Sequence, residues 1–115
     1  MIPDGNNVYG VVQAPKGLWP LWRALQDAFG DGAARWRKSG YDGHEIIQFE
    51  TEWASFETEP LGSGEFLFNG GVGGSAADAE RLVSQLSSVL NEAGVKHVLE
   101  LYDDDGGLIR DFKAP

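Results

Sequence analysis

The stretch from Glu65 to Tyr102 constrains the fold of this chain more than any other segment. It reads as a strand, a glycine-rich turn from Asn69 to Ser75, a helix and a second strand. Ser75 is a typical N-cap residue with Asp78 three positions later, and Gly94 follows the last apolar position of the helix. We therefore predict a strand–helix–strand unit, whose helix carries one apolar stripe: Ala79, Leu82, Val83, Leu86, Val89, Leu90 and Ala93.

Shorter elements precede and follow this unit. Apolar residues at helical spacing predict a first helix from Leu18, with Pro20 in its first turn and Gly30 as its stop. Pro60 to Gly64 and Asp103 to Gly107 are typical turn sequences. Strands are predicted at Val8–Gln13, Glu45–Thr51, Glu65–Asn69, Lys96–Tyr102 and Leu108–Phe112, the last pairing back as a hairpin.

The order of these elements predicts an α+β fold. Strand, helix, glycine and strand follow one another in residues 8–50 and again in residues 65–102. This repetition favours a ferredoxin-like βαβ duplication, in which a mainly antiparallel sheet and two helices on one face form a two-layer sandwich. The C-terminal hairpin would extend the sheet. We expect one domain over residues 1–115, a length sufficient to bury a core without metal or disulfide support.

Charge and composition narrow the classes of function. Nine basic residues against eighteen acidic ones give a net charge of −9, which repels nucleic acid and anionic membranes and attracts basic surfaces. The chain has no cysteine, which excludes disulfides and thiolate metal sites. Neither a signal sequence nor an apolar run of membrane-spanning length is present, so a cytoplasmic protein is the expectation.

The glycine-rich turn is a candidate ligand-binding motif. Gly71, Gly73 and Ala76 match the G-x-G-x-x-A pattern of dinucleotide sites, and Asp103 ends the next strand. The chain is too short for a dinucleotide fold, and Ser75 already satisfies the helix terminus. A P-loop is excluded because no Gly-Lys-Ser/Thr sequence follows the turn. The favoured interpretation is a flexible turn that leads into a capped helix, with no cofactor.

Metal and catalytic motifs are weak. Asp103, Asp105 and Gly106 match part of a calcium loop, but Leu101 stands where an earlier acid is required, so a hairpin turn is favoured. His44 and His97 each open a predicted strand and would face one another under pseudo-symmetry, yet two histidines without a third ligand make a poor metal site. With no nucleophile motif in view, we expect a protein that is not an enzyme.

The acidic and aromatic strands between Phe49 and Glu59 are the predicted functional surface. Carboxylates steer a basic partner and an exposed aromatic side chain anchors it, a combination that tight protein interfaces use. The one basic cluster, Arg35 to Lys38, is expected to pair with these strands inside the molecule. The predicted partner-binding residues are Glu50, Glu52, Trp53, Phe56, Glu57 and Glu59.

These observations predict a non-enzymatic acidic protein that neutralises or regulates a basic protein partner. In size, charge and fold class the chain resembles the small acidic, cysteine-free α+β proteins that bacteria use as immunity proteins or inhibitors, although no family motif covers any residue. The alternative is a small-ligand or nucleotide-binding domain that uses the glycine-rich turn at 70–75. A third possibility is a homodimer formed through an edge strand of the C-terminal hairpin.

Overall fold

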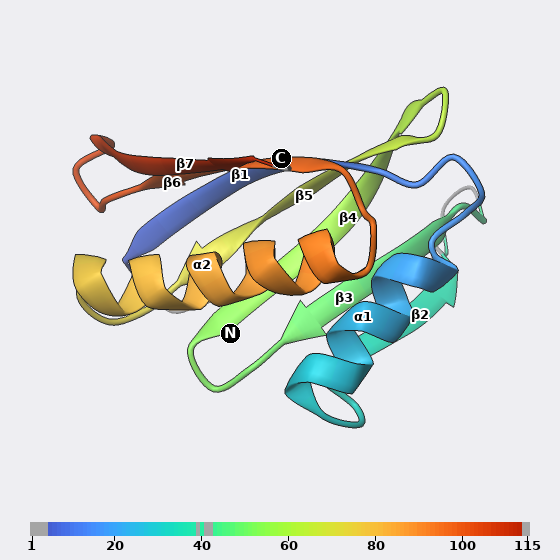
Figure 1. Cartoon of the computed structure of the whole chain (residues 1–115), viewed down its shortest axis with the longest axis horizontal. Coiled ribbons are helices and arrows are strands. Elements are labelled where there is room, and N and C mark those ends of the chain that lie inside the picture. The colour runs from blue at the N-terminus through green and yellow to red at the C-terminus, as the bar shows by residue number, and fades with distance from the viewer. Residues whose placement is uncertain (1–4, 39, 41–42, 114–115) are drawn as a thin grey trace.

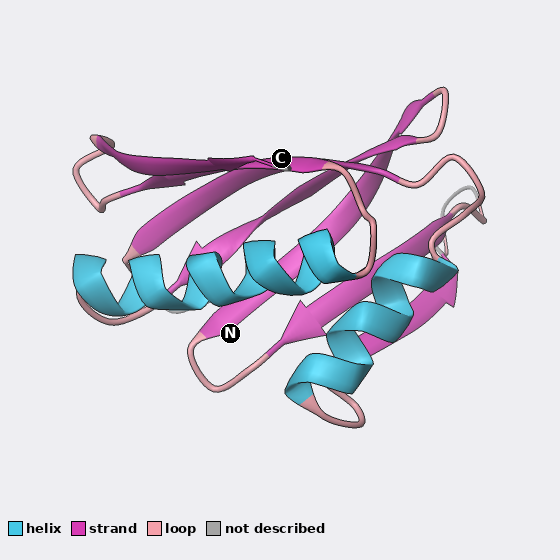
Figure 2. Ribbon diagram, viewed as in Figure 1, coloured by secondary structure: helices cyan, strands magenta, loops and turns pink. Residues whose placement is uncertain are grey.

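The computed structural model describes residues 5–38, 40 and 43–113. Within them the chain forms seven strands and two helices (Figures 1 and 2). None of these helices is long and apolar enough to cross a membrane. In chain order the elements are β1 (Asn6–Gln13), α1 (Trp19–Phe29), β2 (Ala34–Lys38), β3 (Glu45–Glu50), β4 (Ala54–Gly62), β5 (Glu65–Val72), α2 (Ala76–Glu92), β6 (His97–Tyr102) and β7 (Leu108–Lys113).

The strands form one open sheet in the order β2-β3-β4-β5-β1-β6-β7, and every neighbouring pair is antiparallel. The predicted α+β class and the hairpin of β6 and β7 are confirmed, and β3, β4 and β5 form an antiparallel meander. In the β5–α2–β6 unit, β1 lies between the two strands, whereas β1 and β2 are separated by β5, β4 and β3. Because the two units place their strands so differently, the ferredoxin-like duplication is not confirmed.

Helix α2 follows its sequence signals at both ends. The Ser75 hydroxyl oxygen accepts a hydrogen bond from the Asp78 backbone N–H at 3.1 Å, as the N-cap prediction requires. At the other end Gly94 has φ +74°, and the Val95 N–H donates to the Leu90 carbonyl at 2.9 Å, which is a Schellman motif. The predicted stripe is buried at Ala79, Val83, Leu86 and Leu90.

Both helices lie on the same face of the sheet, in front of it in Figure 1. The core forms where their apolar stripes meet inward-facing strand residues. Its centre is a cluster of three rings, in which Phe68 lies 5.0 Å from Phe56 and 6.5 Å from Phe49 between ring centroids. All three are at most 2% exposed, and burying each such side chain is worth about 1.5–3 kcal/mol.

The glycine-rich segment is mostly strand, and the predicted turn from Asn69 to Ser75 is wrong for its first half. Strand β5 continues through Gly70 and Gly71 to Val72 and leaves only Gly73 and Gly74 as the connection to α2. Gly70 pairs with Phe56 on β4, and a Cβ atom at Gly70 would lie 2.2 Å from the Ser55 carbonyl oxygen. Glycine stands here because the neighbouring strand approaches closely.

Two further boundaries differ from the prediction. Strand β4 continues through Pro60 to Gly62, so the hairpin loop is only Ser63 and Gly64. Both have positive φ, +54° and +78°, as a two-residue type I′ turn requires. The basic cluster, unassigned from sequence, is the edge strand β2, which α1 holds in place because the Trp22 indole N–H donates to the Ala34 carbonyl at 3.0 Å.

Candidate functional site

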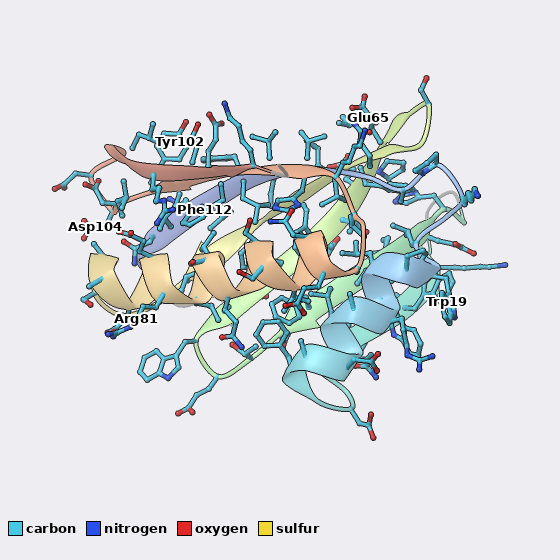
Figure 3. The ribbon with its side chains drawn as sticks, viewed as in Figure 1. Trp19, Glu65, Arg81, Tyr102, Asp104 and Phe112 are labelled. Carbon is cyan, nitrogen blue, oxygen red and sulfur yellow. The ribbon has the colours of Figure 1, made fainter. Side chains whose placement is uncertain are left out.

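The sheet face turned away from α1 and α2 is the candidate site, and we call it the open face. In antiparallel strands directly paired residues share a face, and successive residues alternate between faces. In Figure 3, Tyr102 and Glu65 point away from the helices, whereas Phe112 lies between the sheet and α2. The pairing of Asn7 with Tyr102 and of Gln13 with Glu65 therefore places the odd-numbered residues of β1 on the open face.

Three of the four predicted carboxylates share this face. Glu57 pairs with Gln48 and Asn69, Glu59 pairs with Leu67, and Glu50 pairs with Ser55, all on the side away from the helices. Their side chains are exposed. Glu52 is also exposed but lies in the turn between β3 and β4. Sequence analysis thus located three of the carboxylates of the open face.

Phe56 does not belong to this surface. It is 2% exposed and packs between Phe49 and Phe68 on the helix side of the sheet. The predicted role of Phe56 as an exposed anchor therefore does not fit the structure. The reason is parity: Phe56 and Glu57 are neighbours in one strand, so their side chains must point to opposite faces.

Trp53 is 57% exposed in the turn between β3 and β4. Its backbone carbonyl accepts a hydrogen bond from the Gly73 N–H at 2.8 Å, which joins this turn to the connection before α2. Trp53, Gly73 and Gly74 line a cavity of about 370 Å³ together with Val72 and Leu82. The structure therefore brings the predicted aromatic anchor next to the glycine segment, two features that the sequence placed apart.

The basic cluster pairs inside the molecule, as expected. The Arg37 Nε donates to Gln48 Oε1 at 3.0 Å, and the Gln48 Nε2 donates to Glu57 Oε2 at 3.0 Å. The Arg37 guanidinium lies 4.0 Å from the same carboxylate. Exposed pairs of this kind contribute about 0–1 kcal/mol, so they orient Glu57 more than they stabilise the fold.

The centre of the open face is apolar, and sequence analysis missed it. Val11 pairs with Leu67 on one side and with Val98 on the other. Beside this row, Tyr9 and Tyr102 form a T-shaped pair with ring centroids 5.5 Å apart. Tyr9 is 54% exposed and Val98 is 40% exposed. Strand alternation in the sequence already separates Tyr9 and Val11 from Val8 and Gly10. The strand partners of Tyr9 and Val11 lie more than fifty residues away in the sequence, so local patterns did not show the apolar centre.

Carboxylates outnumber basic groups on the open face. Desolvation of the Tyr102 hydroxyl and the nearby Glu100 carboxylate raise the pKa of Tyr102 above its usual value, so this ring stays neutral. Among the described residues, six acidic side chains share the face with three basic ones: Glu50, Glu57, Glu59, Glu65, Glu100 and Asp111 against Arg35, Arg37 and Lys113. The surface has an apolar centre and a net negative rim.

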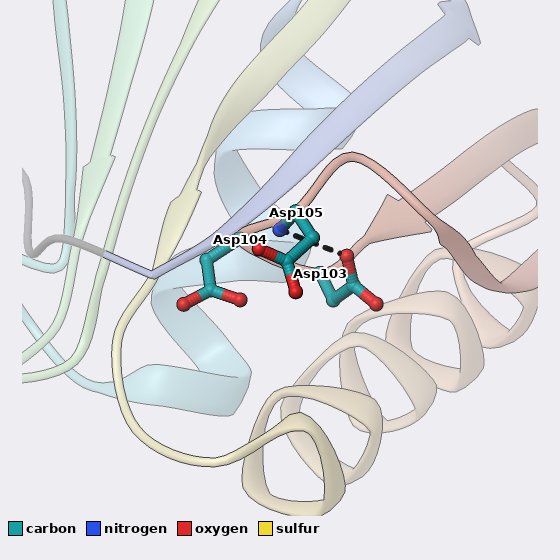
Figure 4. A group of neighbouring side chains, drawn as sticks. All are labelled: Asp103, Asp104 and Asp105. Atoms are coloured by element: carbon teal, nitrogen blue, oxygen red, sulfur yellow. Dashed lines mark hydrogen bonds between the residues drawn. The ribbon is translucent and has the colours of Figure 1, made fainter.

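The three-aspartate turn is the one cluster among the described residues that could supply several metal ligands (Figure 4). One oxygen of the Asp103 carboxylate accepts hydrogen bonds from the backbone N–H groups of Asp105 at 3.0 Å and Gly107 at 2.8 Å. Asp104 and Asp105 are exposed. The Asp103 side chain therefore builds the hairpin turn between β6 and β7, the role that the sequence favoured.

The two histidines do not face one another. His97 begins β6 and His44 precedes β3, and three strands separate β3 from β6 in the sheet. His97 is buried, with Nδ1 2.9 Å from the Val95 carbonyl oxygen and Nε2 2.7 Å from the Ser87 hydroxyl oxygen. Both ring nitrogens thus have partners within the fold, and His97 joins α2 to β6.

The antiparallel sheet also removes the geometry of a dinucleotide site. Such a site needs adjacent parallel strands on either side of the glycine-rich turn. Here β1 separates β5 from β6 and runs antiparallel to both, and Gly71 of the G-x-G-x-x-A match lies within β5.

Comparisons with protein-family models, with curated proteins and with solved structures found no match to this chain.

Proposed function

We propose that this protein binds a basic protein partner through the open face and blocks the surface that it covers. The excess of carboxylates on an uncovered sheet with an apolar centre is the observation that carries the proposal. The net charge of −9 acts in the same direction, because it attracts a basic partner over distances of several ångströms. The protein would act as an inhibitor or immunity protein and would not be an enzyme.

The open face has the anatomy of a protein interface. Interfaces combine an apolar, aromatic centre with a polar rim, and tyrosine is enriched among their strongest contacts. Tyr9, Val11 and Val98 would supply the centre, and Glu57, Glu59 and the other carboxylates the rim. The two longest extents of the molecule are 34 and 32 Å, and a standard interface buries roughly 800 Å² per partner.

Steric occlusion is the proposed mechanism. A basic effector that acts on an anionic substrate needs positive charge at its active surface, and carboxylates held on a rigid sheet can occupy that surface instead. Rim charges would accelerate encounter, so the association rate should fall as salt rises. The apolar centre would then set the lifetime of the complex, because burying it is largely independent of salt.

A pair of charge-matched variants tests this proposal. E50K/E57K/E59K reverses three carboxylates of the open face, and D31K/E92K/D104K reverses three exposed carboxylates elsewhere. Each variant changes the net charge by +6, from −9 to −3. Used as baits in a native lysate, wild type and the control should retain the same basic protein. The open-face variant should bind that protein at least about 100-fold more weakly, because each reversed charge now repels it.

Equal loss of binding in both variants would mean that net charge alone acts, and equal retention would mean that another surface binds. Either result contradicts the proposal. Circular dichroism and urea unfolding of both variants confirm that the fold is intact.

A second candidate function is binding of a small ligand beside the glycine segment. One observation favours it, the cavity that Gly73 and Gly74 line together with Trp53. Pairing of two copies through the edge strand β7 also stays a prediction. Light scattering at two protein concentrations tests the pairing, since a dimer would double the apparent mass at the higher concentration.

A further inference from the structure

The cavity beside Trp53 lies where the turn between β3 and β4 meets the end of β5 and the first turns of α2. Its volume of about 370 Å³ falls at the lower end of the range for small-molecule sites. Trp53, Val72 and Leu82 supply apolar walls, and Gly73 and Gly74 supply bare backbone. The cavity is therefore suited to a small and mostly apolar occupant.

Hydrogen bonds hold the walls in place. The buried Asn6 side chain donates to the Val72 carbonyl at 3.1 Å and to the Gly74 carbonyl at 3.2 Å, which fixes the segment that follows β5. The Gly73 N–H donates a hydrogen bond to the Trp53 carbonyl. Gly74 has φ +89°, and a Cβ atom there would lie 3.4 Å from an Asp78 carboxylate oxygen. The positive φ would strain any side chain at Gly74, so glycine leaves bare backbone on this wall.

Among the described residues, Asp78 is the one charged group on the lining, and its carboxylate already has a partner. It pairs with the Arg81 guanidinium on the next turn of α2, and the backbone N–H of Asp78 donates to the Ser75 hydroxyl oxygen at the same helix terminus. The bonds to Ser75 and Arg81 lower the pKa of Asp78 below its usual value, so it stays ionised at neutral pH. An ionised carboxylate with partners of its own offers little to a cation and repels an anion.

We propose that this cavity binds a neutral planar aromatic molecule of one or two rings. Bare glycine backbone lets a ring approach closely, and the Trp53 ring can pack against an aromatic ring in an offset or T-shaped arrangement. Covering Trp53 also removes apolar surface from water, since its side chain is 57% exposed. The inference rests on the second candidate function and is independent of the open face.

A matched pair of probes tests the ligand class. Indole-3-acetamide and indole-3-acetate have the same ring and nearly the same shape, but only the acetate is an anion at pH 7. Ligand-observed NMR and calorimetry on the full chain should detect saturable binding of the acetamide, with a Kd on the order of 1 mM or tighter. The acetate should bind at least about tenfold more weakly, because Asp78 and the net charge of −9 repel it.

Three variants locate the site. Trp53→Ala removes a wall and Leu82→Phe places a ring in the cavity, so each should weaken binding of the acetamide at least about fivefold. Trp19→Ala is the matched control, because Trp19 is 51% exposed on α1 and does not line the cavity. It should leave the affinity unchanged.

Three results would overturn the inference: no saturable binding of the acetamide, acetate binding of equal strength, or unchanged affinity in both cavity variants. The E50K/E57K/E59K protein separates this failure from failure at the open face. It should bind the acetamide with wild-type affinity even where it no longer binds a basic protein.

Discussion

Replacing Gly70 by alanine tests whether the glycine segment is a packed strand or a flexible turn. In the structure Gly70 lies within β5, opposite Phe56 of β4. A Cβ atom at Gly70 would lie 2.2 Å from the Ser55 carbonyl oxygen and 2.6 Å from Cγ of the Phe56 ring. Carbon and oxygen atoms do not approach so closely without a bond, so the backbone of β4 or β5 must move.

Two effects of opposite sign set the change in stability. Alanine in place of glycine restricts the unfolded chain, which by itself stabilises a protein by about 0.4–1 kcal/mol. Forcing an additional carbon into a well-packed region costs about 1–3 kcal/mol, and more where backbone must shift. Because the nearest atom is a backbone oxygen, the upper part of that range applies. We expect Gly70→Ala to lower the free energy of unfolding by about 2 kcal/mol.

Gly40→Ala is the control for this substitution. Among the described residues, nothing lies within 4 Å of a Cβ atom at Gly40, and its φ is outside the left-handed region. Gly40→Ala should therefore leave the free energy of unfolding unchanged or raise it by up to about 1 kcal/mol. Urea unfolding followed by tryptophan fluorescence measures both variants. If Gly70→Ala were as stable as Gly40→Ala, β5 would not continue through the glycines as described.

Two further predictions concern α2. Ser87→Ala leaves the buried Nε2 of His97 without its partner and should lower the free energy of unfolding by about 1–3 kcal/mol. Ser88→Ala, on the exposed side of the helix, should lower it by less than about 0.5 kcal/mol. Urea unfolding compares the two variants, and equal losses would contradict the structural role of the Ser87–His97 bond. Asp78 has a lowered pKa in the folded state, so its contribution to stability is present above its unfolded pKa, near the usual 3.8, and is lost as pH falls through the lower folded value. The stability difference between wild type and Asp78→Asn, measured by urea unfolding at several pH values, should therefore shrink on acidification. A difference that is independent of pH would contradict this assignment.

Local signals in the sequence predicted the elements that local contacts define. Helix α2 was predictable from Ser75, its apolar stripe and Gly94, because each acts within one turn of the helix. The hairpin of β6 and β7 was predictable for the same reason, since the Asp103 side chain binds backbone groups only two and four residues away.

Features that depend on distant residues were not predictable from local patterns. Gly70 belongs to a strand because of Phe56, which lies on the neighbouring strand fourteen positions earlier in the chain. Alternation assigns residues to the two faces of a strand, but it does not say which strands become neighbours. The position of β1 between β5 and β6 therefore came only from the structure.

In the candidate site, too, residues within one segment were predictable and contacts between distant segments were not. Glu50, Glu57 and Glu59 were predicted from the acidic composition of their segment. Strand alternation would have excluded Phe56 from the open face, because Phe56 and Glu57 are neighbours in one strand and point to opposite faces. The apolar centre was missed because Tyr9 and Tyr102 are far apart in the sequence and meet only through pairing of β1 with β6. A patch assembled from several strands gives no contiguous sequence signal.

Methyl NMR of the complex with the basic protein retained by the wild-type chain tests the central claim most directly. On the open face, the methyl groups of Val11, Leu67 and Val98 should shift or broaden on binding, because the partner would cover them. The methyl groups of Val89, half-buried on α2, should not change. The opposite pattern, with Val89 perturbed and the three open-face residues unchanged, would show that the helix side binds the partner and would contradict the account.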